Sequence, residues 1–109
     1  MAMKMAVIFV NGLEKDASRL VKITSAATMG AYSNLGMFSK KPRNVEIVPV
    51  QVIDIQTLWG LWYNAEKFGL NHFLQTNDKN NMNPLQTALA VGPEESEKLN
   101  KLSANLRLF

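Results

Sequence analysis

The chain has 109 residues, of which 47% are hydrophobic and 19% are charged, and its formal net charge is +3. This is the size of a single domain, spanning residues 1–109, with enough apolar residues to build a core. Because the sequence contains no cysteine, disulfides, thiolate nucleophiles and cysteine metal sites are excluded.

The first ten residues predict a buried strand. Met5 to Val10 is a continuous apolar run with branched side chains, the pattern of a strand covered on both faces. The apolar segment is too short to cross a bilayer, and it lacks the small-residue cleavage pattern of a secretory signal. We therefore expect a cytoplasmic protein that has no membrane partner.

The next segment predicts a helix from Ala17 to about Leu35. The side-chain oxygen of Asp16 or Ser18 can cap its first turn. Residues at helical spacing give it an apolar inner stripe: Leu20, Ile23, Ala27 and Ala31. Small residues are frequent and allow close approach to a sheet, and we interpret Thr24, Ser25 and Thr28 as small packing residues as well.

A second strand and helix follow. Val45 to Ile53 is rich in valine and isoleucine, and Pro49, which cannot donate to a ladder, indicates an edge position, a bulge or a break. Asp54 is placed to cap the helix, and Gly69 to end it. The helix has an apolar face made by Leu58, Leu61, Trp62, Ala65 and Phe68.

The last part of the chain predicts two strands and a helix. The strands are Asn71 to Gln75 and Leu85 to Val91, separated by a polar loop from Thr76 to Pro84. Gly92-Pro93 is expected to introduce the helix, with glutamates near its positive end and Leu99 and Leu102 on its inner face. The complete order predicts an α/β fold, a single small domain with a mixed four-stranded sheet and helices packed on it.

The basic residues favour an anionic ligand. They are concentrated in residues 1–44, and the densest cluster lies in one polar loop. The candidate ligand-binding residues are Arg19, Lys22, Lys40, Lys41 and Arg43. Such an excess can attract a phosphate or another anion, and a solvated surface is the competing interpretation.

Other candidates for chemistry are few. His72 is the single histidine, so no histidine metal cluster can form, and general acid–base catalysis would need a partner within reach. The pair Trp59 and Trp62 fits a core or dimer contact better than base stacking. No phosphate-binding glycine loop, dinucleotide fingerprint or nucleophile elbow is present, so we assign no catalytic residue, metal or cofactor.

Three stretches resemble the type II peptidyl-tRNA hydrolases: Val7 to Tyr32, Asp54 to Leu70, and Gly92 to Phe109. Together they cover more than half of the chain. The resemblance implies a peptidyl-tRNA hydrolase-like fold, but most of the expected active-site residues are replaced. Gly12 stands at the place of an aspartate, Ala17 and Arg19 stand at the places of two lysines, and Ala26 stands at the place of a helix histidine. In the loop before the last strand, the aspartate and threonine of the family have no clear counterpart, and Asp78 is the acid nearest to their place. The chain also resembles short, uncharacterised bacterial proteins that share this fold without the hydrolase signature.

Three functional hypotheses remain. The first is a non-hydrolytic relative that binds an anionic ligand or a partner. The second is a divergent hydrolase of peptidyl-tRNA or another ester, with Arg19 and Asp78 recruited to a rebuilt site. The third is a structural module that forms a homodimer through an apolar helix face, which would also hide the surface that so small a domain leaves unburied.

Overall fold

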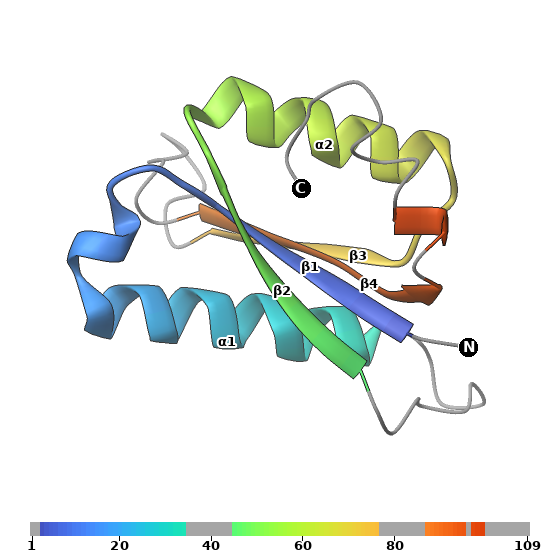
Figure 1. The fold of residues 1–109 in the computed structure, drawn as a ribbon, viewed down its shortest axis with the longest axis horizontal. Coiled ribbons are helices and arrows are strands. Elements are labelled where there is room, and N and C mark those ends of the chain that lie inside the picture. The colour runs from blue at the N-terminus through green and yellow to red at the C-terminus, as the bar shows by residue number, and fades with distance from the viewer. Residues whose placement is uncertain (1–2, 35–44, 77–86, 96, 100–109) are drawn as a thin grey trace.

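Two helices lie on opposite faces of a four-stranded sheet (Figure 1). The computed structural model describes residues 3–34, 45–76, 87–95 and 97–99. The elements are β1 (Met3–Val10), the 3-10 helix η1 (Leu13–Lys15), α1 (Ala17–Ser33), β2 (Val45–Val52), α2 (Ile55–Lys67), β3 (His72–Thr76) and β4 (Thr87–Glu95). No helix in the described part of the chain is long and apolar enough to cross a membrane.

The strand order in the sheet is β2-β1-β4-β3. β1 pairs in parallel with β2, where Val7 lies opposite Pro49, and antiparallel with β4, where Val7 lies opposite Ala90. β3 and β4 are antiparallel. The predicted mixed four-stranded sheet in an α/β fold is therefore confirmed.

The core has two parts, one on each face of the sheet. Side chains of a strand alternate between faces, so Met5, Val7 and Phe9 of β1 lie on the α1 side, and Ala6, Ile8 and Val10 lie on the α2 side. All six are buried. The expectation that the first strand is covered on both faces is confirmed.

The helix ends follow the capping chemistry of the sequence. Asp16 Oδ1 accepts a hydrogen bond from the Arg19 N–H at 3.2 Å, and Asp54 Oδ1 accepts one from the Thr57 N–H at 2.8 Å. That backbone bond, together with the Thr57 hydroxyl, lowers the pKa of Asp54. At the end of α2, Gly69 has φ +67° and the following Leu70 is buried, as predicted.

Two predictions about the inner faces and the last helix are wrong. Phe68 is not on the inner face of α2; it is the C-cap residue and is 46% exposed. The helix expected from Pro93 does not begin there, because β4 continues to Glu95 and pairs with the first residues of β1. Residues 97–99 are helical, and Leu99 is buried in the α2-side core as expected, whereas Leu102 lies outside the described residues.

The extension of β4 depends on Gly92. Its φ is +126°, and a Cβ at this position would lie 2.6 Å from the Lys4 carbonyl oxygen. The register of β1 and β4 shifts between Lys4 and Ala6, next to this contact. The two backbones approach each other closely here, and this approach allows the strand to continue past Pro93. A Gly-Pro pair in the sequence does not by itself reveal such a contact.

Candidate ligand-binding groove between α1 and β2

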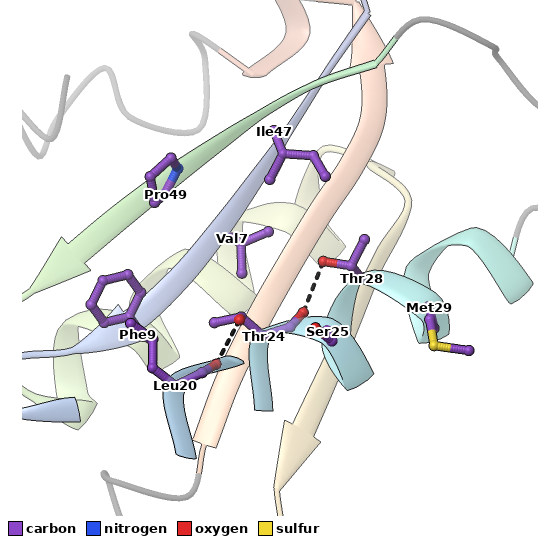
Figure 2. A pocket seen from close by; sticks show the side chains of 9 residues that line it. All are labelled: Val7, Phe9, Leu20, Thr24, Ser25, Thr28, Met29, Ile47 and Pro49. Carbon is purple, nitrogen blue, oxygen red and sulfur yellow. Dashed lines mark hydrogen bonds between the residues drawn. The ribbon is translucent and has the colours of Figure 1, made fainter. Parts of the chain in front are cut away.

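The lateral position of α1 leaves part of the sheet open. α1 packs mainly on β4 and β3, and less on the central strand β1. Gly30 allows this placement, because its missing side chain leaves the space occupied by the ring of Phe73 in β3. Within the described part of the chain, Ile47 and Pro49 of the edge strand β2 are consequently left uncovered on this face, and a groove runs between them and α1 (Figure 2).

The groove has a volume of about 590 Å³. Its lining comes from β1, β2 and α1, and we call the space bounded by these residues the α1–β2 groove: Val7, Phe9, Ile47, Pro49, Leu20, Thr24, Ser25, Thr28 and Met29. Buried Val7 and Phe9 of β1 lie between the β2 residues and the α1 residues (Figure 2). The described lining is therefore predominantly apolar, and none of these nine side chains is acidic or basic.

Three hydroxyls on α1 are the polar groups of the lining. Thr24 Oγ1 donates to the Leu20 carbonyl at 2.6 Å, and Thr28 Oγ1 donates to the Thr24 carbonyl at 2.8 Å (Figure 2). Ser25 is exposed and makes no side-chain hydrogen bond to a described residue. The interpretation of these three residues as packing residues is incomplete, since they also provide the polar surface of the groove.

Large exposed apolar side chains surround the groove. Met29 is 70% exposed and Ile47 is 50% exposed, and both are in its lining. Val21, 63% exposed, lies three residues before Thr24 and one turn before Ser25, on the same side of α1. Exposed apolar residues gathered at one place on a surface are typical of a binding site.

Of the predicted basic residues, the structure describes Arg19 and Lys22, and neither is in the lining of this groove. Arg19 is in the first turn of α1, with its Nε 3.8 Å from Asp16 Oδ2, and both side chains are about half exposed. Lys22 follows one turn later, is exposed, and forms no ion pair with the described residues. Lys40, Lys41 and Arg43 lie outside the described residues. Within the described residues, the predicted site residues Arg19 and Lys22 are therefore neighbours on one helix.

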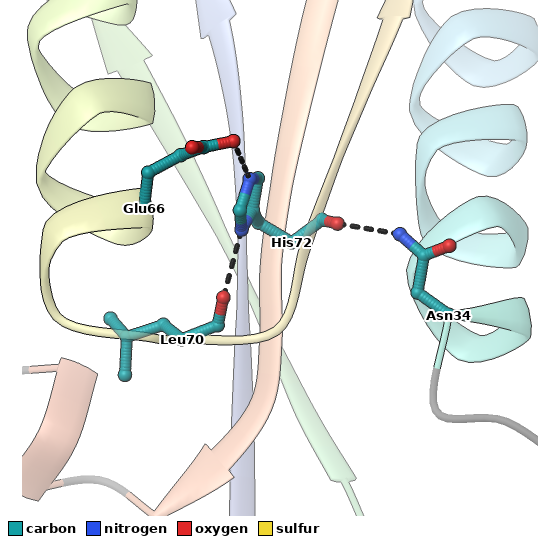
Figure 3. Close-up of polar contacts among 4 residues, drawn as sticks. All are labelled: Asn34, Glu66, Leu70 and His72. Carbon is teal, nitrogen blue, oxygen red and sulfur yellow. Dashed lines mark hydrogen bonds and ion pairs between the residues drawn. The ribbon is translucent and has the colours of Figure 1, made fainter.

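The contacts of His72 connect elements of the fold to one another (Figure 3). Its Nδ1 is 2.8 Å from the Leu70 carbonyl oxygen and its Nε2 is 3.3 Å from Glu66 Oε1, while Asn34 Nδ2 donates to the His72 carbonyl at 2.7 Å. The ring also contacts Trp62 edge-on, with centroids 6.4 Å apart. These contacts tie the start of β3 to the ends of both helices, and no hydroxyl nucleophile takes part in them.

The tryptophan pair lies beside His72, since the Trp62 ring contacts the His72 ring. Trp59 and Trp62 form an edge-to-face contact with centroids 5.5 Å apart, and both rings are partly buried. Trp62 packs against the core on the α2 side of the sheet, which agrees with the core contact favoured for the pair. No cluster in the described residues has the three histidine or acidic ligands expected of a metal centre.

Of the positions that the hydrolase resemblance singles out, Gly12, Ala17 and Arg19 lie near the start of α1. Gly12 precedes η1, and Ala17 is the first residue of α1. Ala26 is on α1, and Asp78 lies outside the described residues. Comparison of the chain with protein-family models gives no match, and comparison with curated proteins gives none either.

Proposed function

We propose that the protein binds a ligand without hydrolysing it, and that the α1–β2 groove is its binding site. The observation that carries this proposal is the lining of the groove, which combines apolar side chains with three hydroxyls and, among the described residues, contains no titratable group. Acid–base catalysis needs a positioned proton donor or acceptor, and a hydroxyl nucleophile needs a base beside it. The lining offers neither, whereas a concave, mostly apolar site with a few polar groups is the usual form of a small-molecule site.

We further propose that the chain is a cytoplasmic relative of the type II peptidyl-tRNA hydrolases that has lost their chemistry. Support comes from the order of elements and from the three stretches that resemble this family. Gly12, Ala17 and Ala26 supply no acid, base or cation at places where the resemblance would require them. A protein that has a hydrolase-like fold but lacks these groups is better suited to binding a ligand than to cleaving an ester.

An anionic ligand at Arg19 and Lys22 is the second candidate function. One observation favours it: the two residues are three positions apart on α1, so both charges lie on one exposed side of the helix. The partner that the sequence favours for such a surface is a phosphate or a tRNA, and its binding would weaken steeply with salt. A homodimer through an apolar helix face remains the third hypothesis.

Peptidyl-tRNA cleavage and tRNA binding by the purified protein separate these functions. We expect no cleavage above the uncatalysed rate, because no described residue of the groove lining can act as an acid or a base. Salt-sensitive tRNA binding that is lost in the variant Arg19→Glu/Lys22→Glu would support the anionic ligand. Cleavage that disappears in Arg19→Ala would contradict the proposed function and establish a rebuilt hydrolase site.

A further inference from the structure

We propose that the ligand of the α1–β2 groove is a neutral, mainly apolar small molecule that carries an N–H or O–H donor. This inference rests on the proposed function and specifies the class of ligand. It follows from the size of the groove, from the charges that are absent from its lining, and from the orientation of its hydroxyl hydrogens.

The size and lining fit a small organic molecule. The volume of about 590 Å³ falls within the range of about 300–1,000 Å³ in which most ligand pockets lie. The Phe9 ring, the Pro49 ring and the Met29 side chain provide apolar surfaces from three different elements (Figure 2). A ligand between these surfaces would remove apolar area from water on both sides, which is the main source of affinity at such sites.

The electrostatics favour a neutral molecule over an anion. Among the residues that the structure describes, the lining contains no lysine, arginine or histidine. Arg19 and the lining residue Thr28 are nine positions apart, so they lie about half a turn apart around the helix axis. Arg19 is moreover engaged with Asp16. Lys22 is three positions before the lining residue Ser25, but it is not itself in the lining. A charged group placed between the described lining residues would therefore lose water without gaining an opposite charge from them.

The two threonine hydroxyls of the lining favour a ligand that donates hydrogen bonds, while the Ser25 hydroxyl can donate or accept. Thr24 and Thr28 use their hydroxyl hydrogens on the carbonyls of Leu20 and Thr24, one turn earlier. What each hydroxyl still offers to the groove is its oxygen lone pairs, which accept hydrogen bonds. A carboxylate or a sulfonate would place further lone pairs against them, whereas an N–H or O–H group would be complementary.

The β2 edge argues against an added peptide strand as the occupant. The Val52 carbonyl accepts from the Asn11 N–H at 2.7 Å, so Val52 and alternate residues before it point their peptide groups at β1. Pro49 is at an intervening position, and its peptide group therefore faces the open edge. Because proline has no N–H, the edge lacks a donor there, and strand addition is disfavoured. Pro49 thus occupies an edge strand, one of the three alternatives that the sequence left open.

Two fluorescent probes with the same skeleton test the charge preference. N-phenyl-1-naphthylamine is neutral and has one N–H, while 1-anilinonaphthalene-8-sulfonate adds one negative charge to it. In titrations of the full chain, we expect the neutral probe to bind at least about tenfold more tightly. Ser25→Phe should fill the groove and abolish its binding, and Ser33→Phe, which makes the same change on α1 outside the lining, should leave it unchanged.

The N-methyl derivative of the neutral probe tests the hydrogen bond, because it lacks the N–H. We expect it to bind about three- to tenfold more weakly than the parent probe. The variant Thr24→Val/Thr28→Val keeps the shape of both side chains and removes both acceptors, so it should eliminate this difference. Equal binding of the two probes to the unaltered protein would overturn the assignment of a donor.

The remaining outcomes separate this inference from the proposed function. Tighter binding of the anionic probe, lost in Arg19→Glu/Lys22→Glu, would overturn the neutral ligand and leave a binding protein. A dimer in sedimentation that Ser25→Phe dissociates, with no probe bound, would identify a second copy as the occupant and overturn the small-molecule inference. No probe binding by a monomer would contradict the proposed groove function itself.

Discussion

Two glycines in helices provide a quantitative test of the packing of α1. Alanine in place of glycine within a helix stabilises by about 1 kcal/mol, because glycine loses more backbone entropy on folding. A Cβ added at Gly60 in α2 meets no atom within 4 Å, so the variant Gly60→Ala should gain this full amount. A Cβ added at Gly30 in α1 would overlap the ring of Phe73.

Overpacking of this kind costs about 1–3 kcal/mol, which outweighs or cancels the helical gain. We expect Gly30→Ala to lower the free energy of unfolding by up to about 2 kcal/mol relative to the unaltered protein. The difference between the two alanine variants should then be about 1–3 kcal/mol, with Gly60→Ala the more stable.

Urea unfolding followed by the fluorescence of Trp59 and Trp62 measures both variants, and equal m-values would show that the comparison concerns stability. A double-mutant cycle with Phe73→Leu then isolates the contact, since the cost of Gly30→Ala should fall when the ring is removed. If Gly30→Ala stabilised the protein as much as Gly60→Ala, Phe73 would not lie on Gly30, and the packing that opens the groove would be refuted.

Three further changes probe other parts of the fold. Gly92→Ala should cost about 1–3 kcal/mol or more in thermal unfolding, because φ is +126° and the Lys4 carbonyl oxygen is backbone that cannot move aside; a cost near zero would contradict the observed strand pairing. Leu58→Ala should cost about 2–5 kcal/mol in urea, as the side chain is fully buried in α2, and a loss below that range would place it nearer the surface. Asp54→Asn should be less stable than the unaltered protein at neutral pH, since the pKa of Asp54 is lowered on folding and its stabilisation is present above the unfolded pKa near 3.8 and lost as pH falls through the folded value. Unfolding at pH 7 and at pH 2 should therefore show a gap that closes in acid, and a gap of constant size would contradict the cap.

The local features of this fold were predictable from the sequence because neighbouring residues determine them. Asp16 and Asp54 cap the helices to which they are adjacent, and Gly69 ends α2 by its own backbone conformation. Ile23, Ala27 and Ala31 form the buried stripe of α1 as their spacing indicated. The alternation along β1 likewise follows from one short segment.

The features that the sequence did not reveal depend on partners far away in the chain. β4 continues through Pro93 because β1 begins at Met3 and supplies a pairing partner. The open face of β2 depends on the strand order and on the lateral placement of α1, neither of which has a local signal. One signal was present, however: Thr24 and Thr28 follow Leu20 at intervals of four residues and mark a second face of α1 beside the buried stripe.

The groove and the stability of the domain therefore have a common origin. Phe73 packs on Gly30, and this contact holds α1 over β3 and β4 rather than over β1 and β2. The same placement leaves Ile47 and Pro49 uncovered on the opposite side. A helix centred over β1 would shelter these side chains but would close the groove. The small residues of α1 thus do more than allow close packing: by setting where the helix lies, they determine that the sheet keeps an apolar surface open to a ligand.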